Sequence, residues 1–376
     1  MNRFLQNIFQ PASILTGTII GAGVFSLPLV FVRVGLATGL IYLALFGALF
    51  IVLYLLYADV IVRTPGEHRF VGYAKLYLGK PGFAAALVIG LVELLVVLAI
   101  YLILAPSFLK LVFGGSAGTD MLVFWALGSA SVAMSNKRMG FLEFVIVNGI
   151  ALIIALIFLF GFGPFLANPI RFGFPDLTKF SVAGPILFSL SGSLAIPEMI
   201  AYFRESKLSP SSFPGALVLG MAIPVVCYAA FVIGIIGLSP AVSGDSVTGL
   251  MGSVPAVALG GIGILGFLAL ISSYVVVGLN VRHIIEYDLG FSRALGFAAV
   301  VAVPPVIYLA GLTNFTQAVS FAGSVFLPLE SFIILLVWKR MQATNQEQPV
   351  FSGWWAPYAV PVIAAVFLAV LGYVIL

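Results

Sequence analysis

Long apolar segments follow one another along almost the whole chain, and short polar stretches separate them. Most of these segments reach the roughly 20 residues that a helix needs to cross a hydrocarbon layer about 30 Å thick. A membrane barrel would instead show alternating segments of about ten residues. The pattern therefore predicts an all-α polytopic membrane protein.

We expect eleven membrane-spanning helices, of which the fourth is short for a full crossing at about 1.5 Å per residue. The limits read from the apolar pattern are 11–33, 36–62, 82–113, 121–135, 141–163, 183–203, 214–238, 252–280, 294–312, 315–338 and 356–376. The longest expected loops are 64–81 and 164–182, and neither is long enough for a folded domain. The chain, residues 1–376, is therefore expected to be one membrane domain.

Composition agrees with this expectation, because 62% of the residues are hydrophobic and 8% are charged, against about 25% charged in soluble proteins. Most of the 17 lysine and arginine residues fall on one side if the N-terminus is cytoplasmic, as the positive-inside rule requires. The C-terminus is then outside. The compact length and short loops indicate a bacterial or archaeal cell (inner) membrane, with the lipid bilayer as a partner and no nucleic acid.

The first apolar segment is interrupted by small residues, with Gly17, Gly21, Ala22 and Gly23 ahead of Pro28. Each glycine in a helix costs about 1 kcal/mol relative to alanine, and a backbone without side chains lets a ligand approach closely. The Gly17-x-x-x-Gly21 spacing also suits close packing of two membrane helices. The segment indicates either a broken helix at a binding site or a tight helix contact.

The sixth apolar segment contains a second interruption, the run Ser191-Gly192-Ser193, and Pro197 and Glu198 follow it. Proline suits the first position of a helix, and an acidic residue suits its first turn. We expect one half-helix to end in this run and a second to begin at Pro197. A proline kink, with the serines bonded to the preceding turn, is the alternative.

Interruptions at the first and sixth segments indicate a binding site near the middle of the membrane, between the two halves of an inverted-repeat transporter. Free amides near 22–25 would attract a substrate anion, and carbonyls freed around 188–191 would accept hydrogen bonds from an ammonium group. A zwitterion such as an amino acid meets both demands.

At this point the residues resemble a known family. The run Gly21-Ala22-Gly23-Val24-Phe25 is similar to the Gly-x-Gly-x-Phe motif of the amino acid–polyamine–organocation transporter superfamily. The sixth segment resembles the amino acid/auxin permease branch and the bacterial tryptophan/tyrosine permeases. Later motifs agree, namely Pro304-Pro305, and Phe321-Ala322-Gly323 with Pro328.

The resemblance implies the leucine-transporter fold, with two inverted five-helix repeats at about 11–163 and 183–338 and one extra helix at about 356–376. Its substrate site would lie between the broken helices and the third and eighth spans. Carried over by position, the substrate-binding residues would be Ile20, Gly21, Ala22, Gly23, Phe25, Tyr101, Phe188 and Ser191. Apolar packing explains an aromatic wall at Tyr101 or Phe188 equally well.

The eighth segment places Ala269, Ser272 and Ser273 on one helix face. Sodium-coupled relatives use a carbonyl and two hydroxyls at this spacing, together with carbonyls that correspond here to Gly17 and Ile20. Oxygen ligands suit a hard cation, whereas serines that bond to their own helix are the alternative. The fifth segment has no lysine of the kind that replaces sodium in some relatives, which favours sodium over a proton, although tryptophan/tyrosine permeases are proton-coupled.

Three carboxyl groups lie within apolar segments, on Glu93, Glu198 and Glu330. Ionisable groups inside a membrane are costly, so each indicates a function or a protonated carboxyl. Glu198, beside the second interruption, is the candidate proton relay, and the sequence assigns no role to Glu93 or Glu330.

These observations predict a secondary transporter that moves neutral or aromatic amino acids by alternating access, coupled to sodium or to a proton and without a cofactor. An uncoupled exchanger and an amino acid sensor remain alternatives. An enzyme is excluded by the lack of His-Glu-x-x-His, Gly-x-Ser-x-Gly and clustered histidine and carboxylate motifs. A channel would show a pore formed by oligomeric symmetry, and neither the oligomeric state nor the particular amino acid follows from the sequence.

Overall fold

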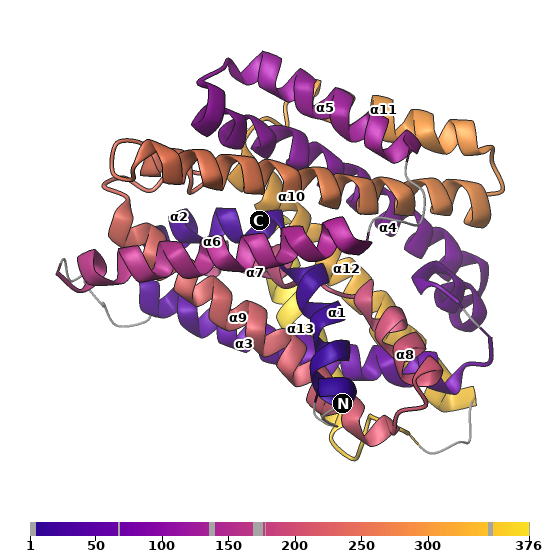
Figure 1. Ribbon diagram of the computed structural model, residues 1–376. Helices are drawn as coiled ribbons and strands as arrows, with labels where there is room; N and C mark the ends of the chain where they lie inside the picture. The colour runs from indigo at the N-terminus through magenta and orange to yellow at the C-terminus, as the bar shows by residue number, and fades with distance from the viewer. Residues whose placement is uncertain are drawn as a thin grey trace.

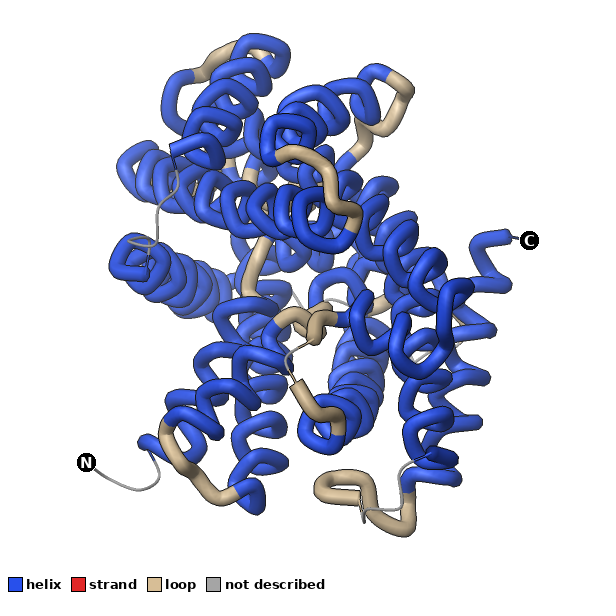
Figure 2. Tube along the Cα trace, turned by 90° about the vertical axis from the view of Figure 1, so that its right-hand side faces the viewer, coloured by secondary structure: helices blue, strands red, loops and turns tan. Residues whose placement is uncertain are grey.

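The computed structural model describes residues 5–66, 68–134, 140–167, 176, 178–344 and 349–375, without the side chains of 134, 140–148 and 375. In this part of the chain, α-helices are joined by short loops and no β-strand forms (Figure 2). In chain order the α-helices are α1 (Gln10–Ile19), α2 (Leu27–Val34), α3 (Leu36–Arg63), α4 (Phe70–Phe113), α5 (Ala117–Met134), α6 (Gly140–Ala167), α7 (Ala183–Leu190), α8 (Ala195–Glu205), α9 (Phe213–Leu238), α10 (Ala256–His283), α11 (Arg293–Leu309), α12 (Phe315–Thr344) and α13 (Ala356–Ile375).

Each expected span contains one helix or one broken pair, α1 with α2 and α7 with α8. Eight stretches of the described chain are long and apolar enough to cross a membrane, and the bent pair of α1 and α2 makes a ninth. The helices α5 and α11 are shorter apolar helices. That α5 and α11 also cross the membrane, which would give eleven crossings, therefore stays a prediction.

The region expected as the inner loop 64–81 differs from the prediction. Helix α4 already begins at Phe70 and continues through a kink at Gly79, where φ is 70°. Glycine adopts this left-handed conformation without steric cost. Val71, Tyr73 and Ala74 are buried, so tertiary contacts stabilise the helix here. The charged residues of this segment had led to the prediction of a loop. Within the expected outer loop 164–182, residues 168–175 and 177 lie outside the described residues, and α6 continues to Ala167.

The helices form two groups that enclose the centre of the molecule. Helices α4, α5, α10 and α11 contact one another and lie towards the top of Figure 1. Below them, α8 and α9 each contact both α1 and α3, and α7 lies against both α3 and α12. The two broken pairs therefore belong to one group and face the other.

Glycines allow direct contact between helix backbones at two crossings. A Cβ atom on Gly161 of α6 would lie 2.1 Å from the carbonyl oxygen of Gly234 on α9. A Cβ atom on Gly323 of α12 would lie 1.9 Å from the carbonyl oxygen of Gly184 on α7. Small residues at such crossings bring membrane helices together through van der Waals contact. The first half of the second broken pair is therefore fixed against α12.

A buried carboxylate on α3 anchors the segment that leads into α13. The Asp59 oxygens accept hydrogen bonds from the amides of Val350 and Phe351, at 2.8 and 3.1 Å, and from the Ser352 hydroxyl at 2.5 Å. The Arg63 guanidinium lies 3.4 Å from the same carboxylate. A buried charge is tolerated when it is paired and hydrogen-bonded in this way.

Candidate functional site

The break in the first span follows the small residues that interrupt its sequence. The last helical hydrogen bond of α1 joins the Ile20 amide to the Thr16 carbonyl at 2.9 Å. Gly21 is extended, and a short 3-10 helix, η2 (Ala22–Ser26), then leads into α2. The half of the span before the break and the half after it differ in direction by 51°. The backbone carbonyls from Gly17 onwards thus accept no hydrogen bond within α1 and need other partners.

The break in the sixth span separates Leu190, the end of α7, from Ala195, the start of α8. The prediction that Pro197 opens the second half is wrong by two residues. The amides of Ala195 and Ile196 bond to the carbonyls of Gly192 and Ser193, at 3.0 and 3.2 Å, and so begin the turn before the proline. Glu198 does lie in the first turn of α8.

Two buried tyrosine hydroxyls hold these breaks in place. The Tyr228 hydroxyl on α9 lies 2.7 Å from the Ile19 carbonyl and 3.0 Å from the Ser189 carbonyl, so it joins the ends of α1 and α7. The Tyr54 hydroxyl on α3 accepts a hydrogen bond from the Gly192 amide at 2.7 Å. Neither role was predicted from the sequence, although a tyrosine inside an apolar segment indicates a hydroxyl that needs a hydrogen-bond partner.

Replacing Tyr228 with phenylalanine is expected to destabilise the protein by about 1–3 kcal/mol, because two buried carbonyls lose their partner. The thermal unfolding temperature in detergent measures this effect. Tyr358→Phe is the matched control, since that side chain is 72% exposed. Equal unfolding temperatures for the two variants would contradict a structural role for the Tyr228 hydroxyl.

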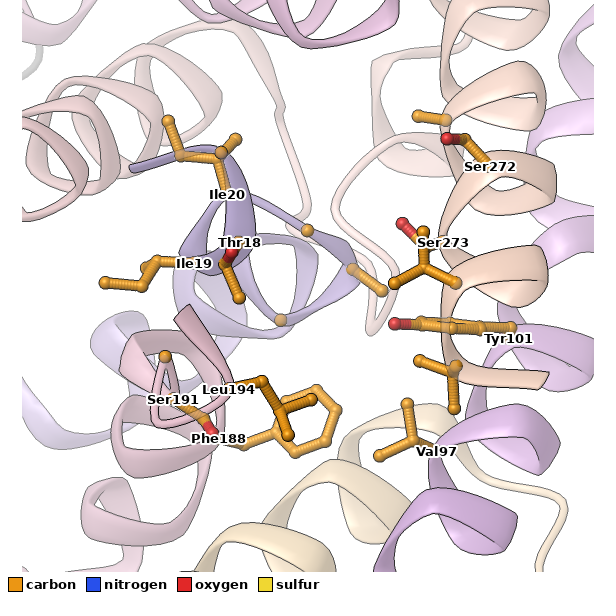
Figure 3. A pocket seen from close by; sticks show the side chains of 18 of the residues that line it. Thr18, Ile19, Ile20, Val97, Tyr101, Phe188, Ser191, Leu194, Ser272 and Ser273 are labelled. Carbon is orange, nitrogen blue, oxygen red and sulfur yellow. The ribbon is translucent and has the colours of Figure 1, made fainter. Parts of the chain in front are cut away.

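A cavity of about 190 Å³ lies between the two breaks, α4 and α10, and is called the substrate cavity (Figure 3). Seven of the eight residues expected to bind substrate line it: Ile20, Gly21, Ala22, Gly23, Tyr101, Phe188 and Ser191. Further apolar residues, none of them predicted from the sequence, complete its wall: Ile19, Leu94, Val97, Ile150, Leu194, Val276 and Val277. Backbone groups of the breaks therefore face apolar side chains across the cavity.

Phe25, the eighth residue, is not among the residues that line the substrate cavity. Its ring packs edge-on against Phe108 and Phe231, with centroid distances of 5.0 and 5.5 Å. Its carbonyl accepts a hydrogen bond from the Ser246 hydroxyl at 2.6 Å. Phe25 thus joins α4, α9 and the 239–255 loop.

All five residues of the expected sodium-like site line the substrate cavity: Gly17, Ile20, Ala269, Ser272 and Ser273. Figure 3 shows the Ser272 and Ser273 hydroxyls on the wall opposite the break in α1, with the Tyr101 hydroxyl beside Ser273. Ser331 on α12 donates to the carbonyl one turn back at 2.7 Å. Among the described residues neither Ser272 nor Ser273 forms such a bond, so the alternative explanation for these serines loses its support.

A second cavity, of about 310 Å³, continues from the substrate cavity and is called the inner vestibule. The two cavities share Thr18, Glu93 and Ser193, and the vestibule extends to Arg69 and Asp288 near the ends of α4 and α10. This is the side expected to be cytoplasmic.

The three membrane carboxyl groups differ in their surroundings along these cavities. Glu198 lines the vestibule and is exposed, whereas Glu330 is 8% exposed and accepts a hydrogen bond from the Ser193 hydroxyl at 2.7 Å. Glu93 lines both cavities. The sequence placed Glu198 nearest to the second break, but the carboxyl group bonded to that break belongs to Glu330.

Comparisons with known proteins agree with this architecture. The profile of the tryptophan/tyrosine permease family matches residues 5–372. The tyrosine-specific transport system 1 of Haemophilus influenzae is 24% identical over 371 residues, which cover 90% of both chains. The crystal structure of MhsT in complex with L-phenylalanine superposes with a TM-score of 0.67 at 19% identity, over 97% of each chain. The likeness to MhsT shows that the chain has the leucine-transporter fold.

Proposed function

Since the chain belongs to the tryptophan/tyrosine permease family, we propose that it carries aromatic amino acids through the membrane by cation-coupled alternating access. Membership establishes that the protein is an integral membrane amino acid transporter and not an enzyme. The aromatic substrate, the coupling ion and the conformational cycle are the proposed part. The family and the name of the tyrosine-specific relative support the choice of substrate.

The substrate cavity is the observation on which the proposal rests. The substrate carboxylate binds at the amides of Ala22 and Gly23, where η2 begins, because helix N-termini favour anions. The ammonium group binds at carbonyls that the end of α7 leaves free near Phe188. The aromatic side chain then lies against Val97, Leu194 and the Phe188 ring, which point into the cavity (Figure 3).

Alternating access requires that one end of the cavity closes while the other opens, and the two ends differ in this structure. Phe25, Phe108 and Phe231 pack together at the expected outer end, while the inner vestibule continues from the opposite end. The group of α1, α3, α8 and α9 rocks against α4, α5, α10 and α11. Substrate and cation drive this motion because they bind the occluded state better than the open states.

Sodium is the favoured coupling ion, carried with the substrate. The carbonyls of Gly17, Ile20 and Ala269 and the hydroxyls of Ser272 and Ser273 supply five oxygen atoms, the ligand type that hard cations select. One observation supports this assignment: the five residues line one cavity. Carbonyls beyond the end of α1 are also without a helical partner.

Uptake of labelled amino acids into proteoliposomes tests the proposal. A panel of aromatic, branched, small and charged amino acids is offered with an inward sodium gradient or an inward proton gradient. Tyrosine, tryptophan or phenylalanine is expected to accumulate with the sodium gradient. Exchange without any ion gradient would instead indicate an uncoupled exchanger, and binding without flux would indicate a sensor.

Replacing Phe188 with alanine is expected to weaken the binding of aromatic substrates by about tenfold, because an aromatic contact contributes roughly 0.5–1.5 kcal/mol beyond the area that it buries. The loss of affinity is measured by competition, in which unlabelled tyrosine or alanine inhibits the uptake of labelled tyrosine and gives an inhibition constant for each. Phe321→Ala on α12, whose side chain is 43% exposed, is the matched control. A proportional loss for alanine would show that Phe188 does not contact the aromatic side chain.

A further inference from the structure

Two carboxyl groups on the transport path have no part in the proposed substrate and cation sites. Glu330 lies on α12 and is buried, and Glu93 lies on α4 at the junction of the substrate cavity and the inner vestibule. Glu93, Val97 and Tyr101 follow at intervals of four residues, so they share one face of α4. Glu93 is thus the inner end of the stripe that α4 presents to the substrate.

Glu330 is bonded directly to the broken helix. Its Oε1 atom accepts the Ser193 hydroxyl at 2.7 Å, and Ser193, 7% exposed, lies in the break between α7 and α8. The backbones of α7 and α12 touch at Gly184 and Gly323. A change in the protonation of Glu330 is therefore transmitted to the broken helix through the Ser193 hydrogen bond.

No cation neutralises this pair among the described residues. The ion pairs found there are Arg63 with Asp59 and Lys179 with Asp176. Arg69 is exposed at the rim of the vestibule, where its guanidinium lies 3.4 Å from the Asn280 side-chain oxygen. The ionisable groups that face Glu93 and Glu330 from the surrounding elements are Tyr54 and Tyr57 on α3, Arg69 before α4, Glu198 on α8 and Asp288 after α10.

We propose that Glu93 and Glu330 bind one shared proton when the inner vestibule closes, and that Glu330 transmits this change to the broken helix through Ser193. With the vestibule open, both carboxyl groups line it, and water inside the vestibule screens their charges, while Glu330 keeps its hydrogen bond to Ser193. Closure removes that water, and two neighbouring ionised carboxylates without a cation are then strongly disfavoured. One proton from the inner solution binds to a carboxylate oxygen on closure and returns to that solution on opening. The step forms and breaks only this O–H bond.

This inference rests on the alternating access of the proposed function but not on sodium as its cation. The closed state holds one proton more than the inward-open state, so raising the pH favours the open state. The ratio of closed to open protein falls by about tenfold for each pH unit where only the closed state is protonated. Amino acid exchange requires closure and therefore slows as the pH rises.

Exchange of labelled L-tyrosine by the full chain in proteoliposomes, with equal pH and ion concentrations on both sides, measures this dependence. Wild-type exchange is expected to fall at least about tenfold between roughly pH 6 and pH 8. Glu330→Gln and Glu93→Gln are expected to flatten the profile, because the amide remains neutral at every pH. In Glu330→Gln the amide oxygen still accepts the Ser193 hydroxyl. Glu205→Gln, on the exposed end of α8, is the matched control and keeps the wild-type profile.

A merely structural role for the pair predicts that Glu330→Gln and Glu93→Gln change the rate but keep its pH dependence, and this result would overturn the inference. A profile that is flattened by Glu198→Gln alone would overturn it as well, since the proton would then belong to Glu198. If Glu330→Gln does not fold, Glu93→Gln decides the same question.

A second measurement separates this inference from the proposed function. Val276 lines both cavities, so Val276→Cys in a Cys227→Ser background reports opening of the vestibule through its rate of maleimide labelling in detergent. Because the reactive thiolate fraction of any cysteine also rises with pH, each rate is divided by the rate of free cysteine at the same pH. This corrected labelling rate is expected to rise with pH and to lose its pH dependence in Glu93→Gln. If no amino acid is exchanged but labelling behaves in this way, the proposed function fails and the proton linkage stands. A corrected labelling rate that is independent of pH overturns the linkage.

Discussion

Replacing Ser273 with alanine is expected to raise the sodium concentration that amino acid uptake requires. The variant loses one of two hydroxyls that face the end of α1 across the substrate cavity (Figure 3), where the carbonyls of Gly17 and Ile20 are the other proposed ligands. Losing one of five oxygen ligands raises the sodium concentration for half-maximal uptake by about tenfold or more, which corresponds to roughly 1.4 kcal/mol. Sodium titrations of tyrosine uptake in proteoliposomes measure this change.

Ser331→Ala is the matched control for this variant. Ser331 lies on α12, and its hydroxyl bonds to the Leu327 carbonyl of the same helix, so its loss is expected to leave the sodium titration unchanged. If wild-type uptake follows protons alone and Ser273→Ala remains fully active, the sodium site is wrong. The coupling ion would then have to be sought at the carboxyl groups.

Replacing Gly23 with alanine is expected to reduce transport by between one and two orders of magnitude. The added Cβ atom would lie 2.7 Å from the Cα and Oγ atoms of Ser189 and 3.1 Å from the Phe188 ring. The two breaks meet at this point, so relief requires that backbone segments separate, at a cost of about 1–3 kcal/mol for overpacking. The displaced amides and the Phe188 ring belong to the proposed substrate site.

The rate of tyrosine uptake and its half-saturation constant test this prediction together. Gly260→Ala on α10 is the matched control, because a Cβ atom there meets no other atom within 4 Å. Wild-type uptake by Gly23→Ala would show that the contact between the two breaks is not needed for transport.

The sequence predicted much of the site because two of its parts are local. Glycine and serine runs weaken a helix wherever they occur, so the breaks appeared at the expected places in the first and sixth spans. The spacing of Ala269, Ser272 and Ser273 likewise puts them on one helix face in any packing. The structure brings these residues to one cavity with the breaks, and their binding of substrate and cation remains proposed.

Phe25 shows where this local reasoning ends. It follows the glycines by two residues, yet the turn of η2 directs its ring towards Phe108 and Phe231 instead of the cavity. The apolar wall could not be predicted for a related reason. In the sequence, Val97, Ile150 and Leu194 do not differ from the other apolar residues of a membrane helix. Only the packing of α4, α6 and α8 around the breaks distinguishes them.

By itself, the sequence determined the class of protein, the positions of its helices and the family, because the hydrophobic thickness of a membrane and the weakness of helices at glycine act on local segments. The tertiary structure decided which polar groups meet. Tyr228 bonds to two carbonyls that are 209 and 39 residues away in the chain, and Ser193 bonds to Glu330 across 137 residues. Such partners are set by how the helices cross, since a buried polar group bonds to whatever the packing places beside it.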